Sequence, residues 1–178
     1  DADGTIDATS HTRATYDLNG HLLTYVNEDD DNGDGALSRR ETGTLTYGAT
    51  GLLLTTASEA DQAETIGGTI DGIIDSRTSS TREYDADGNV VREVATAGQT
   101  GFTPVTSISV RAYDSRGNVV SEQDTLEANG TILTRVDVIN TYNSSGQLLT
   151  SVTKTDGNGD GTVDQTTVVS VVYVGVKR

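Results

Sequence analysis

Residues 107–120 read Ser-Ile-Ser-Val-Arg-Ala-Tyr-Asp-Ser-Arg-Gly-Asn-Val-Val, and this stretch predicts the fold of the whole chain. Its first seven residues are partly alternating, which favours a strand. Residues 113–117 predict a tight turn, because Asp114 can hydrogen-bond its own backbone and Gly117 supplies a positive φ. Two aliphatic residues then begin a second strand. The stretch therefore predicts a β-hairpin.

The same pattern recurs along the chain. Six tyrosines each have a glycine twelve positions earlier, and the first five also have a glycine four positions later, followed by an aliphatic pair. They are Tyr16, Tyr47, Tyr84, Tyr113, Tyr142 and Tyr173. We expect each to brace the core or its hairpin rather than to form a ladder that stacks on sugars.

Short links between successive strands favour an antiparallel meander, and nothing in the sequence predicts a helix of three turns. We therefore expect an all-β fold. It is an elongated antiparallel β-repeat of about eleven strands, solenoid-like or an open sandwich, since fixed-period repeats indicate such architectures. Residues 1–178 form a single repeat domain of about six hairpin units, the first and last of them incomplete.

The composition excludes several classes of protein. The chain has 27 acidic and 12 basic residues, a net charge of −15, which opposes binding to nucleic acid and to anionic membranes. Its apolar runs are too short to span a bilayer, so we expect no membrane insertion. The absence of Cys excludes disulfides and thiolate metal sites. An apolar content of 33% is low for a compact core, so we expect another source of stability.

One acidic loop, residues 30–41, has the complete pattern of an EF-hand calcium loop. Oxygen-bearing side chains stand at positions 1, 3, 5 and 9, glycine at 6, an aliphatic residue at 8 and Glu at 12. Oxygen ligands on a flexible loop suit Ca²⁺ better than Mg²⁺. The predicted ligands are Asp30, Asn32, Asp34, the carbonyl of Ala36, Ser38 or a water that it holds, and bidentate Glu41.

Three other loops keep part of this pattern. The last has candidate ligands Asp156, Asn158, Asp160, Thr162 and Asp164 but no closing carboxylate; the first has Asp1, Asp3 and Asp7; the third has Asp71 and Asp75. An insertion before the third loop carries Glu59, Asp61 and Glu64 as candidate replacements for its missing ligands. The fourth and fifth loops precede Tyr113 and Tyr142. They lack the ligand residues and are two residues shorter than the loops at 30–41 and 156–164, so we expect ordinary turns there. Asp, Asn and Gly are also common turn residues, and that alternative stays open for all these loops.

Two resemblances follow from these motifs. The hairpins Tyr-Asp-x-x-Gly-Asn-Val-Val and Tyr-x-x-x-Gly-x-Leu-Leu resemble the YD repeats of Rhs-type secreted bacterial proteins over nearly the whole chain. The spacing of twelve from Gly to Tyr is wider than is usual there, so a closed Rhs shell is not implied. The loops at 30–41 and 156–164 resemble EF-hand and dockerin calcium loops without their flanking helices. The combination is similar to repeat regions of large bacterial surface and matrix proteins, which implies an extracellular or cell-surface location.

The sequence predicts no enzyme. His11 and His21 are the only histidines, and we expect both at exposed strand edges. A nucleophile elbow, a Walker loop and a His-rich metal site are all missing from the sequence. The many carboxylates recur with the repeat, which fits metal ligation better than acid–base catalysis.

The two ends of the chain suggest assembly. Residues 168–176 are apolar on both alternating faces, and an exposed edge strand of this kind aggregates unless it is covered. The first loop lacks its opening ligand, and the last unit stops after one strand. We expect joints at which another copy adds a strand, giving a filament; the alternative is an excised piece of a longer repeat array.

The predicted function is therefore structural. We expect a calcium-stabilised extracellular repeat protein that builds a filament, adhesin stalk or matrix with further copies of itself. The alternative is an extracellular binding module that recognises a glycan or a surface partner.

Overall fold

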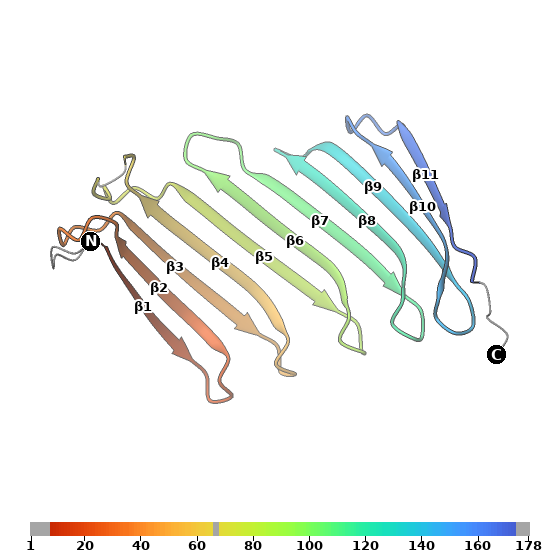
Figure 1. Ribbon diagram of the computed structural model, residues 1–178, viewed down its shortest axis with the longest axis horizontal. Coiled ribbons are helices and arrows are strands. Elements are labelled where there is room, and N and C mark those ends of the chain that lie inside the picture. Colours follow the sequence, from red (N-terminus) through yellow and green to blue (C-terminus); the bar gives the residue numbers. More distant parts are fainter. Residues whose placement is uncertain (1–7, 66–67, 174–178) are drawn as a thin grey trace. The chain divides into compact units, whose positions relative to one another are not determined.

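A computed structural model describes residues 8–65 and 68–173. They form eleven strands and no helix that could cross a membrane (Figure 1). The strands are β1 (Thr9–Tyr16), β2 (Leu22–Asp30), β3 (Arg39–Tyr47), β4 (Leu53–Gln62), β5 (Ser76–Tyr84), β6 (Val90–Gln99), β7 (Val105–Tyr113), β8 (Val119–Ala128), β9 (Thr131–Tyr142), β10 (Leu148–Asp156) and β11 (Gln165–Ser170). Each strand pairs with its neighbours in the sequence, in the order β1 to β11. The expected all-β antiparallel repeat is confirmed.

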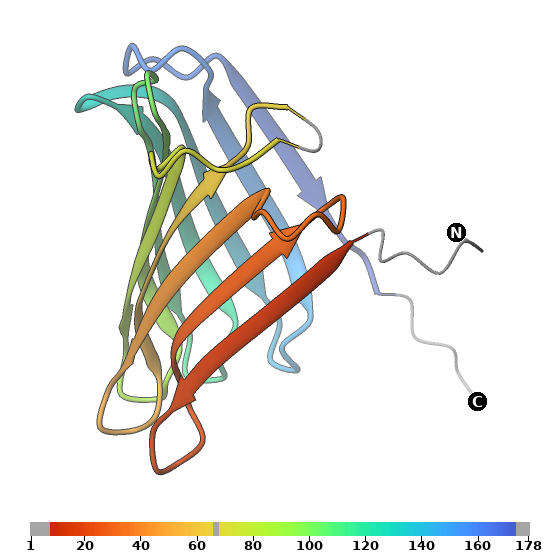
Figure 2. The same cartoon turned by 90° about the vertical axis from the view of Figure 1, so that its left-hand side faces the viewer.

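The chain divides into two compact units, Asp1–Thr81 with Ala95–Pro104, and Arg82–Val94 with Val105–Arg178. The first unit carries β1 to β4, most of β5 and the end of β6. Within it, the turns that follow β1 and β3 lie at one end of the strands, and the loops that follow β2 and β4 lie at the other (Figure 2). The second unit carries the remainder of β5 and β6 and all of β7 to β11.

The hairpin predicted at residues 107–120 forms as expected. Asp114 Oδ1 accepts hydrogen bonds from the backbone N–H groups of Arg116 (2.9 Å) and Asn118 (3.0 Å), and Gly117 has a φ of 81°. Asn118 Nδ2 donates to the other oxygen at 2.9 Å. The side-chain and backbone hydrogen bonds from Asn118 hold the pKa of Asp114 below its ordinary value, against the smaller opposing effect of burial.

The repeating tyrosines lie at irregularities of the ladder. The register shifts between Thr15 and Tyr16, between Thr46 and Tyr47, and between Ala112 and Tyr113. In the second unit, the hydroxyl of Tyr113 donates to the carbonyl of Val90, and that of Tyr142 to the carbonyl of Val119, both at 2.9 Å. Each of these two bonds joins a tyrosine to the aliphatic pair of the preceding repeat. These tyrosines therefore brace one repeat against the next.

The described residues include no buried hydrophobic side chain. Apart from Gly43, the buried described residues are polar: Asp30, Ser38, Asp61, Ser80 and Asp156. Cross-strand hydroxyl pairs support the backbone ladder instead, and equivalent Thr–Thr pairs at 2.6 Å recur in three hairpins: Thr15–Thr24, Thr46–Thr55 and Thr141–Thr150. Each pair contributes roughly 0.2–1 kcal/mol. The low apolar content therefore corresponds to a sheet that is held together mainly by hydrogen bonds.

One cross-strand pair in the first unit fills the space above a glycine. Tyr25 on β2 lies opposite Gly43 on β3, and a Cβ added at Gly43 would overlap the tyrosine ring. The Tyr25 hydroxyl donates to Glu41 Oε1 at 2.7 Å. Burial raises the pKa of Tyr25, and the hydrogen bond to Glu41 raises it further. The ring covers backbone that glycine leaves bare, a known way to stabilise a glycine in a sheet.

The pair between Tyr25 and Gly43 gives a direct test of this packing. Gly43→Ala should displace the tyrosine ring and lower the free energy of unfolding by about 1–3 kcal/mol, as overpacking typically does. Urea denaturation measures the change. Gly48→Ala is the matched control, because its Cβ would find its nearest neighbours at an ordinary 3.7 Å. Equal effects of the two substitutions would contradict the packing described for Tyr25.

Candidate metal centre

The loop between β2 and β3 is organised around one buried carboxylate. Asp30 ends β2 and is only 4% exposed. Its Oδ1 accepts the N–H groups of Gly33 (2.7 Å) and Asn32 (3.2 Å), and its Oδ2 accepts that of Gly35 (2.8 Å). Burial raises the pKa of Asp30, but the backbone hydrogen bonds from Gly35, Gly33 and Asn32 outweigh it, and the net shift is downward. The loop thus holds an ionised carboxylate at its centre.

The rest of this loop, which we call the Asp30 loop (residues 30–38), places further oxygens around it. Asn32 Nδ2 donates to Asp34 Oδ2 at 3.0 Å, and Asp34 Oδ1 accepts the N–H of Ala36 at 2.8 Å. Ser38, also 4% exposed, accepts the N–H of Asp31 at 3.2 Å. Gly35 has a φ of 88°, which a residue with a Cβ adopts only at a cost. Four of the predicted ligands, Asp30, Asn32, Asp34 and Ser38, are therefore tied into one hydrogen-bonded loop with Ala36.

The loop between β10 and β11, the Asp156 loop (residues 156–164), repeats this arrangement. Asp156 accepts the N–H groups of Gly159 (2.7 Å), Asn158 (3.3 Å) and Gly161 (2.8 Å). Gly161 has a φ of 88°, the same as Gly35. The two loops were expected to be related from their sequences, and their hydrogen bonds agree to about 0.1 Å.

The outer candidate ligands of the Asp156 loop are also held by hydrogen bonds. Asn158 Nδ2 donates to Asp160 Oδ2 at 3.1 Å, and Asp160 Oδ1 accepts the N–H of Thr162 at 2.8 Å and its hydroxyl. The side-chain hydrogen bond from Thr162, followed by that from its backbone, lowers the pKa of Asp160. Asp164 Oδ2 accepts the N–H of Gly157 at 2.7 Å. Asp164 thus takes the place that Ser38 has in the Asp30 loop.

The predicted closing ligand of the first of these loops is engaged elsewhere. Glu41 lies on β3, three residues after Ser38, which precedes the strand. Its two oxygens accept the Tyr25 hydroxyl at 2.7 Å and Arg39 Nη2 at 2.6 Å. The structure therefore does not bring Glu41 to the other predicted ligands. The sequence could not show this, because Tyr25 comes from the neighbouring strand.

The third loop contains a residue that the spacing of the calcium pattern did not identify as its first ligand. Asp61, near the end of β4, is 5% exposed, and its Oδ2 accepts the N–H of Gly72 at 2.8 Å. This bond is equivalent to those from Gly35 to Asp30 and from Gly161 to Asp156. We call residues 61–75 the Asp61 loop.

The predicted residues of the Asp61 loop follow the same plan. Asp71 Oδ1 accepts the N–H of Ile73 at 2.8 Å, and Asp75 Oδ2 accepts that of Gln62 at 2.7 Å. The N–H of Asp75 donates to the carbonyl of Ala60 at 2.8 Å, as that of Ser38 does to Asp29 and that of Asp164 does to Thr155. Of the three acids proposed for the insertion, only Asp61 occupies the position that Asp30 and Asp156 have in their loops. Glu59 pairs with Arg77 on the sheet at 3.1 Å, and Glu64 is exposed.

A signal for Asp61 was present in the repeat. Asp61 stands fourteen residues after Tyr47, as Asp30 does after Tyr16 and Asp156 after Tyr142. The calcium pattern places the first ligand five residues before its glycine. That spacing misses Asp61, because the insertion lengthens the segment between Asp61 and Gly72. The spacing of fourteen residues from the tyrosine identifies the buried aspartate, the candidate first ligand, in all three loops.

The Asp30 and Asp61 loops are neighbours in the first unit. The N–H of Ala63 donates to the carbonyl of Ser38 at 2.8 Å, and that of Ile70 donates to the carbonyl of Leu37 at 2.9 Å. The order of one loop therefore supports the order of the other.

The remaining loops differ. Asp1, Asp3 and Asp7 lie outside the described residues. The fifth loop is a two-residue hairpin turn at Asn129 (φ 50°) and Gly130 (φ 74°), so the expected ordinary turn is confirmed there. In the fourth, the N–H of Phe102 donates to the carbonyl of Gln99 at 3.0 Å, as in a β-turn.

The oxygen donors that the loops offer are of mixed kinds. Within residues 8–65 and 68–173, no three acidic or histidine side chains converge as a metal site. The Asp30 loop instead combines the carboxylates of Asp30 and Asp34 with the Asn32 amide and backbone carbonyls. Calcium accepts such mixtures of carboxylate, amide, carbonyl and water oxygens.

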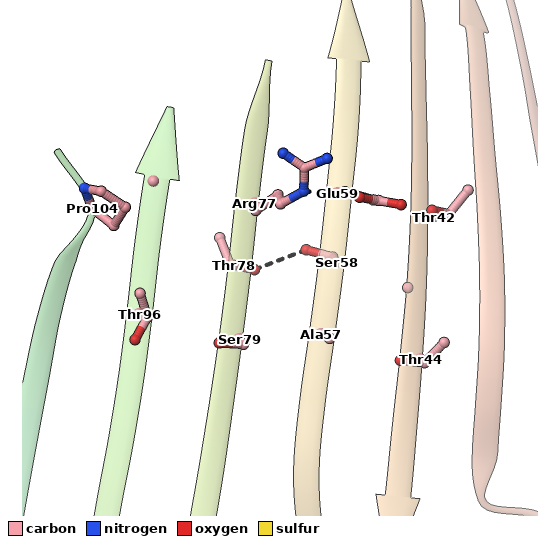
Figure 3. Close-up of a pocket in the computed structure, with 12 residues that line it drawn as sticks. Thr42, Thr44, Ala57, Ser58, Glu59, Arg77, Thr78, Ser79, Thr96 and Pro104 are labelled. Carbon is pink, nitrogen blue, oxygen red and sulfur yellow. Dashed lines mark hydrogen bonds and ion pairs between the residues drawn. The ribbon is translucent and has the colours of Figure 1, made fainter. Parts of the chain in front are cut away.

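The first unit also has a hollow of about 520 Å³ on its sheet (Figure 3). Small side chains of β3 to β6, with Pro104, form most of its lining, and Ser58 and Thr78 hydrogen-bond across it at 2.8 Å. The Glu59–Arg77 ion pair lies beside them. None of the lining residues is aromatic, whereas ligand pockets usually carry hydrophobic and aromatic side chains.

Comparison with protein-family models and with curated proteins gives no match to this chain. The interpretation of the loops therefore rests on their residues and geometry.

The role of Asp30 within its loop can be tested against its neighbour. Asp30→Ala removes the acceptor of three backbone N–H groups and a predicted ligand, so it should lower the melting temperature and reduce bound calcium by one ion per chain. Asp31→Ala makes the same change of charge at an exposed side chain and should do neither. Calorimetric titration and thermal melting measure both quantities. Equal losses from the two variants would show that only net charge matters.

Proposed function

We propose that the chain is a calcium-stabilised structural repeat module of an extracellular or cell-surface assembly, joined to further copies through its edge strands. It serves as part of a filament, adhesin stalk or matrix. This role is structural rather than enzymatic. In it the loops bind calcium and the edge strands of the sheet join further copies.

The loops support the calcium part of the proposal. The Asp30, Asp61 and Asp156 loops share one hydrogen bond, from a glycine N–H to a buried aspartate, and each loop carries further carboxylates as candidate ligands. The chain carries a net charge of −15, so bound cations would relieve repulsion between its carboxylates. Millimolar extracellular calcium fills even weak sites of this kind. Calcium that orders the loops would add directly to the stability of folding.

The observation that carries the assembly proposal is the exposed edge strand β11, which carries two exposed valines. All six of its residues are exposed, including Val168 at 62% and Val169 at 50%. Among the described residues it pairs with β10 alone, and β1 pairs with β2 alone. Unpaired N–H and C=O groups on such edges are templates for another strand. A second copy of the chain can cover both the backbone groups and the valines.

The alternative function, recognition of a glycan or a surface partner, has weaker support. The hollow of the first unit is lined by small residues and lacks an aromatic side chain for stacking on a sugar.

Proline substitutions on β11 test the assembly. The N–H of Val171 donates to the carbonyl of Leu149 at 2.8 Å, so by the alternation of an antiparallel strand Val169 turns its N–H toward β10 and Val168 turns its N–H outward. Val168→Pro should therefore abolish association while leaving the melting temperature almost unchanged. Val169→Pro, the matched control, should lower the melting temperature by removing a bond of the ladder.

Sedimentation velocity and electron microscopy in calcium provide the measurement. Wild-type protein should form assemblies that grow with concentration, and Val168→Pro should remain monomeric. Monomeric wild-type protein at every concentration, or unchanged assembly of Val168→Pro, would contradict the proposal.

A further inference from the structure

Asp61 has a buried carboxylate oxygen without a hydrogen-bond partner. The residue is 5% exposed, and Oδ2 is bonded to the Gly72 N–H, but Oδ1 finds no donor in the structure of the described residues. The equivalent oxygens of Asp30 and Asp156 each accept two backbone N–H groups. A buried charged oxygen without a partner is costly, so its presence calls for a ligand.

The two other carboxylates of this loop are held by one oxygen each. Asp71 uses Oδ1 to accept the Ile73 N–H, and Asp75 uses Oδ2 to accept the Gln62 N–H. Each therefore keeps a second oxygen free of these bonds. Asp34 and Asp160, the corresponding residues of the other two loops, likewise use Oδ1 to accept the N–H of the residue two positions later. Among the described residues no cationic side chain is paired with Asp61, so the unpaired charge is not met by the protein itself.

We propose that Asp61 Oδ1 is the first ligand of a third divalent-cation site, completed by the carboxylates of Asp71 and Asp75, and that this site takes calcium. The inference deepens the proposed function and rests on it. Among the described residues the three carboxylates are not assembled into a metal site, so the calcium-free protein does not hold the complete ligand set in advance. Three carboxylates that are not held in a fixed octahedron suit calcium better than magnesium, which requires a tight octahedron.

The site differs from its neighbours in one measurable respect. In the Asp30 loop the first carboxylate is fully satisfied by backbone N–H groups before any metal binds. In the Asp61 loop one oxygen is not. Removing the charge of Asp61 should therefore help the calcium-free protein and harm the calcium-bound protein.

The experiment compares Asp61→Asn with two other substitutions in the whole chain. Asp30→Asn reports on the Asp30 loop, and Asp87→Asn is a control for charge at an exposed turn residue. Calorimetric titration with CaCl₂ gives the number of bound ions, and thermal melting in EGTA and in CaCl₂ gives stability. Asp71→Asn, at an exposed position, provides a second variant of the same site if Asp61→Asn fails to fold.

We expect Asp61→Asn and Asp71→Asn each to bind one calcium ion fewer than the wild type. In EGTA, Asp61→Asn should melt at or above the wild-type temperature, because its amide oxygen can still accept the Gly72 N–H. In calcium it should melt below the wild type. Asp87→Asn should match the wild type throughout.

Two results would overturn the inference, and they are distinguishable. If both Asp61 loop variants keep the wild-type stoichiometry while Asp30→Asn loses one ion, the third site is wrong and the proposed function stands. Equal destabilisation of Asp61→Asn in EGTA and in calcium would accompany that result, since Asp61 would then only anchor Gly72. If the wild type binds no calcium, the inference and the calcium part of the proposed function both fail.

Discussion

The hydrogen bonds of the antiparallel ladder carry this structure, because no described residue contributes to a buried apolar core. Apolar burial normally supplies most of the free energy that offsets chain entropy. Here cross-strand Thr–Thr pairs and the tyrosine hydroxyls of the second unit add to the ladder instead. Such contacts are individually small, so an additional source of stability is expected. We propose that ordered loops and strands of further copies are the two additional sources of stability.

In the loops, stability comes from hydrogen bonds between buried carboxylates and the backbone. Each of the three buried aspartates, Asp30, Asp61 and Asp156, accepts the N–H of a glycine with a positive φ of 86–88°. The carboxylate accepts backbone N–H groups of the turn, and the same turn carries further oxygen-bearing side chains. A turn and a cation site are therefore compatible uses of the same residues. The common turn residues of this sequence do not have to be assigned to one use alone.

Much of the fold could be predicted from the sequence, because a local signal specifies each hairpin. The spacing from Tyr113 to Gly117 and its equivalents places the turns, and the meander follows from their short links. Interactions between distant residues could not be predicted. Glu41 accepts a hydrogen bond from Tyr25 on the neighbouring strand, and no local pattern reveals a contact between neighbouring strands. Asp61 was hidden by an insertion that changes the loop's length but keeps its bond to Gly72.

The measurement that tests this account most directly is calorimetric melting of the whole chain in calcium, in magnesium and in EGTA. A ligand that binds only the folded state adds about 2.7 kcal/mol per site at a hundredfold excess over its Kd. The account predicts a large rise of the melting temperature in calcium relative to EGTA, and a much smaller rise in magnesium at the same concentration. The same melting temperature in calcium and EGTA would contradict it.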